Sequence, residues 1–255
     1  MFESIILGIV QGLTEFLPVS STAHLILLPW IFNWHGDVDT LTFDIALHGG
    51  TLLALLVCFY KDWIDLLSRK RKLLSYIIIG SIPAGIAGLL LNNFAEQYLR
   101  SPLLISIMLI LVGFIMLAAE KICKYRNQDS INLRDSIFIG IAQAFAIIPG
   151  VSRSGITISA GLFKGLQRDV AARFSFLLST PIIAGALLLH IKKALTNNTE
   201  YDLQLFLWGF IASFLTGYIA IKFLLAFLKK YPLNIFVYYR FILAVVIIAG
   251  IWLKS

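Results

Sequence analysis

The sequence predicts an all-α polytopic membrane protein, and its composition and hydropathy carry this prediction. Of the 255 residues, 59% are hydrophobic and 14% are charged, whereas soluble domains carry about 45–50% apolar and about 25% charged residues. The mean hydropathy is +0.87. This composition excludes a water-soluble globular protein, a disordered chain and a disulfide scaffold.

Six apolar runs have the length of ordinary spanning helices. They cover residues 41–60, 73–91, 102–119, 174–191, 203–228 and 235–253. Two further apolar regions, 1–32 and 135–163, are each interrupted near the middle by proline and a serine cluster. Because irregular backbone at membrane depth must be buried in protein or line a wet cavity, we interpret both regions as re-entrant helical hairpins.

Positive charge in the connecting loops predicts the orientation. Loops 61–72, 121–134, 164–173 and 229–234 hold 14 Lys and Arg residues, against 4 in the remaining loops and termini. The opposite set comprises residues 1–4, 33–40, 92–101, 192–202 and 254–255. Loops rich in Lys and Arg stay in the cytoplasm, so both termini should lie outside. The net charge of +7 then reflects these loops and predicts no nucleic-acid partner.

The two interrupted regions also resemble each other. A shift of 132 positions aligns Gly8-Ile9-x-Gln11 with Gly140-Ile141-x-Gln143, although a chance match is the alternative in a chain rich in Gly and Ile. Each half, 1–120 and 121–255, would hold one hairpin and three spanning helices. Because each half would cross the membrane three times, an odd number, the second half would be inverted relative to the first. The two hairpins of such an inverted repeat would meet near the midplane.

Ionisable side chains in membrane segments are costly and mark candidate functional residues. Glu15 and His24 flank the first break, and Arg153 lies in the second. A buried polar network is the alternative role for Glu15 and His24, and a counter-ion to Glu15 is the alternative for Arg153. For Asp44 and His48, a structural role is about as well supported as a functional one.

Serine and threonine residues after each break are suited to cap a new helix. The candidates are Ser20, Ser21 or Thr22 in the first region and Ser152 or Ser154 in the second. A helix N-terminus binds anions through free N–H groups and its dipole. Two such ends beside Arg153, whose planar fork matches phosphate, predict a phosphate site.

These residue types suit phosphoryl transfer, with His24 as a general base for a serine or a water. Arg153 and the helix ends would stabilise negative charge. Glu15, helped by Gln11, would hold a divalent cation. The residues alone leave hydrolysis and transport almost equally open.

Both interrupted regions resemble signatures of the BacA-type undecaprenyl pyrophosphate phosphatases. The first is 11–25, Gln-Gly-Leu-Thr-Glu-Phe-Leu-Pro-Val-Ser-Ser-Thr-Ala-His-Leu, and the second is 149–157, Pro-Gly-Val-Ser-Arg-Ser-Gly-Ile-Thr. The resemblance implies a phosphatase of the bacterial inner membrane that regenerates the lipid carrier of peptidoglycan synthesis and confers bacitracin resistance. It also implies inverted re-entrant repeats, a site open to the periplasm, and a requirement for Mg²⁺ or Ca²⁺.

The resemblance also implies residue roles. The catalytic residues would be Glu15, Ser21, His24 and Arg153, with the nucleophile open between Ser21, His24 and water. Gln11 and Glu15 would hold the metal, although glutamine at position 11 puts a mechanism with two carboxylates there in doubt. The substrate-binding residues would be Gln11, Ser20, Ser152, Ser154, Thr157 and Arg240.

The alternative function is a transporter or flippase of a phosphorylated polyprenyl lipid, because inverted repeats with broken helices are typical of transporters. A structural scaffold is disfavoured, since it gives no reason to place charges at membrane depth at about 2.5–3.5 kcal/mol each. The expected partners are the lipid substrate and the bilayer, with a homodimer as one candidate oligomeric state.

Overall fold

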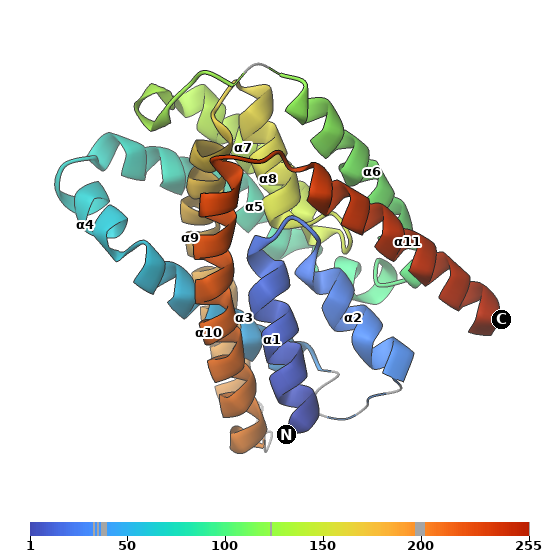
Figure 1. Cartoon of the computed structure of the whole chain (residues 1–255). Coiled ribbons are helices and arrows are strands. Elements are labelled where there is room, and N and C mark those ends of the chain that lie inside the picture. The colour runs from blue at the N-terminus through green and yellow to red at the C-terminus, as the bar shows by residue number, and fades with distance from the viewer. Residues whose placement is uncertain (33, 35, 37–39, 123, 197–201, 255) are drawn as a thin grey trace.

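The computed structural model describes residues 1–32, 34, 36, 40–122, 124–196 and 202–254. These residues form α-helices with two short 3-10 turns and no strand, which confirms the all-α prediction (Figure 1). The helices are α1 (Phe2–Phe16), α2 (Ser21–Phe32), α3 (Leu41–Cys58), α4 (Tyr60–Ser68), α5 (Arg71–Tyr98), α6 (Pro102–Glu120), α7 (Leu133–Ala144), α8 (Arg153–Phe163), α9 (Arg168–Thr196), α10 (Leu203–Leu228) and α11 (Asn234–Lys254); the 3-10 turns are η2 (Gln128–Ser130) and η3 (Phe145–Ile147).

Within the described ranges, five helices are long and apolar enough to span a membrane: α5, α6, α9, α10 and α11. The sixth expected span, 41–60, corresponds to α3 (Leu41–Cys58), which with α4 forms a sixth, bent candidate span. The chain bends by 65° between α3 and α4, and the expected loop 61–72 is mostly helix. Beyond the bend, Asp62 accepts two hydrogen bonds from Arg173 Nη2, at 2.6 and 2.7 Å.

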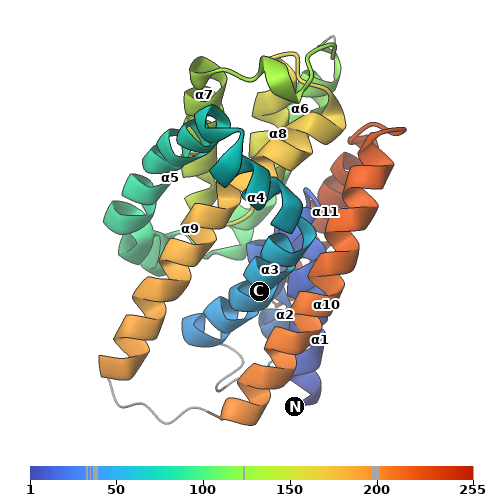
Figure 2. The ribbon, with the colours of Figure 1, turned by 90° about the vertical axis from the view of Figure 1, so that its left-hand side faces the viewer.

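Both interrupted regions form a helix, a break and a second helix. α1 begins at one end of the bundle and α7 at the other, so the two hairpins enter from opposite ends (Figures 1 and 2). Their tips touch, because Ser154 Oγ donates a hydrogen bond to Leu17 O at 3.1 Å. The hairpin tips therefore meet inside the molecule.

The helix boundaries repeat along the chain. Adding 132 to the first residue of α2, α5 and α6 gives the first residue of α8, α10 and α11. Ser20 and Ser152, also 132 apart, have φ of 76° and 69°, a backbone region that is unusual for residues other than glycine. These matches support the division into 1–120 and 121–255, which stays a prediction.

Glycine lets each hairpin approach the helix beside it. A Cβ at Gly8 of α1 would lie 2.4 Å from Gly209 O of α10, and one at Gly140 of α7 would lie 1.9 Å from Gly80 O of α5. No larger residue fits at these contacts without moving a helix, since the obstacle is backbone. The first helix of each hairpin is thereby packed closely against a spanning helix.

The four basic segments lie at one end of the bundle. Contacts join them: Asp62 to Arg173, Glu120 to Arg168 and to Leu233 N, and Arg126 O to Gln167 N. The hydrogen bonds from Arg126 to Asp135 raise the pKa of the Arg126 guanidinium. Parts of the opposite loops 33–40 and 192–202 lie outside the described residues. The grouping agrees with the orientation that the charge pattern predicts.

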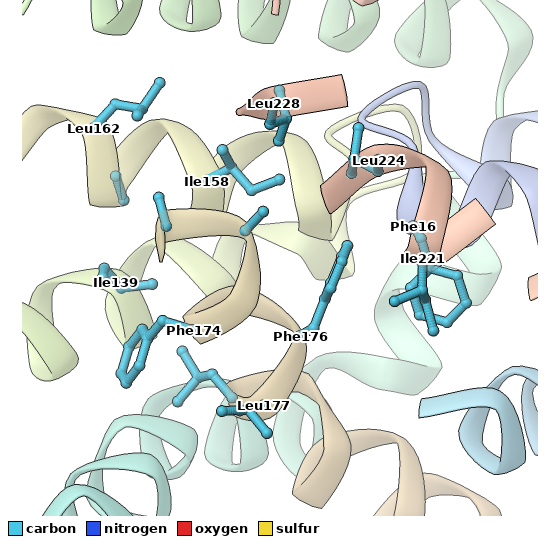
Figure 3. Close-up of a cluster of buried hydrophobic side chains, with 14 of the residues drawn as sticks. Phe16, Ile139, Ile158, Leu162, Phe174, Phe176, Leu177, Ile221, Leu224 and Leu228 are labelled. Carbon is cyan, nitrogen blue, oxygen red and sulfur yellow. The ribbon is translucent and has the colours of Figure 1, made fainter. Parts of the chain in front are cut away.

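A hydrophobic cluster fixes the end of α1 (Figure 3). Phe16 is fully buried and packs edge-on against Phe176 of α9, with ring centroids 5.3 Å apart. Ile158 of α8 and Leu224 of α10 belong to the same cluster. Because Phe16 directly follows Glu15, this packing determines where the carboxylate lies.

Candidate active site

The Glu15 carboxylate accepts hydrogen bonds from both hairpins. Its residue is 6% exposed. Oε2 accepts from Ser21 Oγ at 2.5 Å and from Gln11 Nε2 at 3.1 Å, and Oε1 accepts from Arg153 Nη2. A buried carboxylate is stable only with such partners. The structure therefore brings together four of the residues that the sequence predicted: Gln11, Glu15, Ser21 and Arg153.

The breaks in the hairpins place these side chains. Ser21 is the first residue of α2, and Arg153 is the first residue of α8. Ser152 caps α8, as predicted, by accepting a hydrogen bond from Gly155 N at 3.2 Å. The positive φ of Ser20 and Ser152 carries strain of about 1–3 kcal/mol each. The chain thus turns sharply enough for each new helix to begin beside Glu15.

His48 also belongs to this cluster, although the sequence left its role balanced. Its Nε2 lies 3.6 Å from Glu15 Oε2, and its Nδ1 lies 2.7 Å from the Asp44 carbonyl oxygen. Asp44 itself faces Arg100, with Oδ2 and Nη2 3.9 Å apart. The available signal was an ionisable side chain within an apolar run; its proximity to Glu15 came only from the packing of α3.

A cavity of about 280 Å³ opens beside this cluster. Its polar wall comprises Glu15, Ser20, Ser21, Thr22, His48, Gln143, Ser152 and Arg153. Its apolar wall includes Ile45, Ala84, Gly88, Ile147, Ile182 and Leu187. The cavity therefore suits an amphiphile with an anionic head and a hydrocarbon tail. Gln143 was missed as a candidate site residue, and its alignment with Gln11 was the one sequence signal for it.

His24 does not meet Ser21 as the sequence analysis expected. Its Nδ1 lies 2.7 Å from Ser20 O, and its Nε2 lies 2.7 Å from the Tyr239 hydroxyl oxygen. The His24 and Tyr239 rings are also stacked, with centroids 5.8 Å apart. Both ring nitrogens are engaged there, and His24 is not among the residues that line the cavity. The partner of the Ser21 hydroxyl is Glu15.

Arg240, which was expected to bind substrate, is not among the residues that line the cavity. It is fully buried, and its guanidinium donates to the carbonyl oxygens of Met108, Leu109, Pro18, Gly150 and Val151. Because these carbonyls engage all three of its nitrogens, Arg240 ties both hairpin tips to α6.

Thr157 and Ser154 form hydrogen bonds that hold the second hairpin in place. Thr157 Oγ1 donates to Arg153 O at 2.7 Å and lies 2.5 Å from Ser175 Oγ. Ser154 Oγ is used at the contact with Leu17. Neither residue lines the cavity, so the geometry gives both a positioning role.

The site has few ligands for a metal. Among the described residues there is no group of three or more His, Cys, Asp or Glu that could hold an ion. Gln11 Oε1, however, is buried without a hydrogen-bond partner and belongs to the side chain that contacts Glu15. One carboxylate and one amide oxygen suit a Mg²⁺ or Ca²⁺ ion whose other ligands are phosphate oxygens and water. Glu15 lines the cavity, whereas Gln11 does not, so the fit to a cation bound together with a diphosphate rests on Glu15.

These features define a polytopic membrane protein with an amphiphilic cavity between two re-entrant hairpins. The chain belongs to the BacA family: the family described as "Bacitracin resistance protein BacA" matches residues 4–246. Similar proteins carry the name undecaprenyl-diphosphatase. That of Thermodesulfovibrio yellowstonii is 61% identical over 97% of this chain and 96% of its own length, and that of Moorella thermoacetica is 47% identical over 100% and 99%. The family resemblance of the two motifs is thus confirmed.

Proposed function

We propose that this protein is an integral membrane phosphatase that hydrolyses undecaprenyl diphosphate to undecaprenyl phosphate and inorganic phosphate. One observation carries the proposal: Glu15, Ser21 and Arg153 meet at the polar wall of a cavity whose opposite wall is apolar. The name of the similar proteins supports the same reaction. In the cell, this activity recycles a lipid carrier for peptidoglycan synthesis and confers bacitracin resistance.

In this proposal the lipid diphosphate binds with its head against the hairpin tips. Arg153 donates two parallel hydrogen bonds to the terminal phosphate, and the N-termini of α2 and α8 add their free N–H groups. The first isoprene units lie against the apolar wall near Ala84, Gly88 and Ile182. This orientation places the terminal phosphorus beside Ser21.

Ser21 is the proposed nucleophile and Glu15 its general base, because their side chains share the 2.5 Å hydrogen bond. Glu15 takes the Oγ proton as the Oγ–P bond forms and the anhydride P–O bond breaks, releasing undecaprenyl phosphate. Water then attacks phosphorus, the Oγ–P bond breaks and Oγ regains its proton from Glu15. One water proton stays on inorganic phosphate and the other passes to solvent.

A divalent cation, Mg²⁺ or Ca²⁺, is part of the proposal. Glu15, helped by Gln11, would hold it together with substrate oxygens. When bound, the cation neutralises negative charge on the diphosphate. With a cation bound, Glu15 would share its contacts between the cation and Arg153, and Arg153 would bind the phosphate.

The proposed location is the bacterial inner membrane, with the cavity open toward the periplasm. The basic segments gathered at the end of the bundle opposite the N-terminus (Figure 2) support a cytoplasmic location for that end, since loops rich in Lys and Arg stay in the cytoplasm. A homodimer stays an expectation, tested by native mass spectrometry in detergent.

The first experiment measures phosphate release from undecaprenyl diphosphate by purified protein in detergent, with Mg²⁺, with Ca²⁺ and with a chelator. We expect cation-dependent release without a second compartment. A folded protein that binds the lipid and releases no phosphate would contradict hydrolysis. Movement of unchanged lipid across proteoliposomes would then identify the transporter or flippase alternative.

A further inference from the structure

The amide of Gln143 is buried with no partner for either of its polar atoms. The residue is 3% exposed, and neither Nε2 nor Oε1 forms a hydrogen bond in the described structure. Buried amides in folded proteins nearly always have partners. An amide that lacks any protein partner and also borders a cavity is suited to bind a ligand.

Gln143 lines the cavity that holds the candidate active site. It lies near the end of α7 and shares the polar wall with Glu15, Ser21 and Arg153. The adjoining wall residues from the same segment, Ala144 and Ile147, are apolar. None of the protein groups on this wall forms a hydrogen bond with the Gln143 amide. An anion bound in the cavity would lie within reach of it.

Comparison of the two hairpins explains why the amide is unpaired. Gln143 corresponds to Gln11 under the shift of 132, and Gln11 Nε2 donates to Glu15, four residues later. The residue that corresponds to Glu15 in the second hairpin is Ile147. Replacing the carboxylate by isoleucine removes the internal acceptor from the second hairpin.

We propose that Gln143 is a substrate-binding residue that donates its Nε2 hydrogens to a phosphate oxygen of the diphosphate head. The inference rests on the proposed function and extends it. Phosphate oxygens accept hydrogen bonds, and Glu15 occupies the equivalent acceptor position beside Gln11. A phosphate oxygen would thus accept a hydrogen bond from Gln143, as the Glu15 carboxylate accepts one from Gln11.

The test replaces Gln143 by methionine, which keeps the length of the side chain and removes its hydrogen-bond donors. The same substitution at exposed Gln204 of α10 is the matched control. Three quantities are measured for each purified protein: KM and kcat for undecaprenyl diphosphate, the inhibition constant of inorganic pyrophosphate, and the unfolding temperature in detergent.

We expect Gln143→Met to raise both KM and the pyrophosphate inhibition constant about tenfold or more, with kcat within about threefold. Its unfolding temperature should equal or exceed that of the unmodified protein, because the substitution removes an unpaired buried amide. Gln204→Met should change none of these values. Unchanged KM and inhibition constant in folded Gln143→Met would overturn the proposal, as would a lowered unfolding temperature with unaltered KM.

Gln143→Glu separates the donor role from a metal-binding role. We expect weaker substrate binding than in Gln143→Met, because the new carboxylate repels phosphate. Half-maximal activity at a lower Mg²⁺ concentration, together with the KM of the unmodified protein, would overturn the assignment of Gln143 as a hydrogen-bond donor. If the unmodified protein releases no phosphate, the proposed function fails by itself. Protection of the folded protein by pyrophosphate in thermal unfolding then still tests Gln143.

Discussion

Ser21 and Arg153 occupy equivalent positions in the two hairpins, and both donate a hydrogen bond to Glu15. Each is the first residue of the helix after a hairpin tip, and they are 132 residues apart. Ser21 binds Oε2 and Arg153 binds Oε1. One hairpin thus contributes a hydroxyl and a carboxylate, while the other contributes a guanidinium at the matching place. Four predictions follow from this arrangement and from the groups around it.

Replacing Glu15 by glutamine should lower kcat about 10²–10⁴-fold. The amide cannot take the Ser21 proton, and it removes the negative charge that pairs with Arg153. Steady-state phosphate release measures the effect, with Glu3→Gln on the same helix as the control. Near-normal turnover by folded Glu15→Gln protein would exclude Glu15 as the general base.

Ser21→Ala should abolish a covalent intermediate, because the alanine side chain has no oxygen to attack phosphorus. Acid quenching during turnover, followed by peptide mass spectrometry, should find phosphate on Ser21 in the unmodified protein. His24→Gln is the comparison, and it should retain the adduct because His24 faces Tyr239. A phosphorylated His24, or turnover that survives in Ser21→Ala, would assign the attack to another group.

Arg240→Met should destabilise the protein by about 3 kcal/mol or more, because it leaves several buried carbonyl oxygens without donors. Thermal unfolding in detergent measures this loss, and exposed Arg134→Met controls for removal of a positive charge. The KM of the remaining folded protein should change little. Unaltered stability together with a raised KM would restore the expectation that Arg240 binds substrate.

Gly88→Leu should weaken binding of the long lipid. A Cβ at Gly88 meets no atom within 4 Å, and the residue lines the apolar wall. A leucine there would occupy the space expected for the first isoprene units and raise KM about tenfold or more, whereas inhibition by inorganic pyrophosphate should stay unchanged.

Gly185→Leu of α9 is the control for that substitution. A Cβ added at Gly185 also meets no atom within 4 Å, but Gly185 does not line the cavity. Kinetics with undecaprenyl diphosphate and inhibition by pyrophosphate measure both variants. Equal KM values for the two variants would place the hydrocarbon tail elsewhere.

Local patterns were sufficient to predict much of the fold. Apolar runs gave five of the spanning helices, and the breaks at Pro18 and Pro149 gave both hairpins. The bend after α3 was not predicted, and neither was the contact of Asp62 in α4 with Arg173, 111 positions away. Such a contact forms only when the helices pack, and hydropathy carries no signal for it.

In the candidate site, too, local patterns predicted some residues, whereas contacts between distant residues were not predicted. Glu15, Ser21 and Arg153 were found because they lie beside the breaks, where helix ends must face one another. His24 was assigned to Ser21 through closeness in sequence, but Tyr239 engages it from 215 positions away. Arg240 was expected at the substrate only because the family resemblance implied it. Its donors go to backbone carbonyls, which only the fold reveals.

The pairing of Glu15 with Arg153 has a consequence for how the protein enters the membrane. The two residues lie 138 positions apart, so the ribosome delivers the carboxylate long before its guanidinium partner. During that interval Glu15 has no cation from the second hairpin, and dry lipid would be a costly environment for its charge. Within the first hairpin, only Gln11 and Ser21 of the contacts described above can already donate hydrogen bonds to the carboxylate. The ion pair itself can form only after both halves have been synthesised.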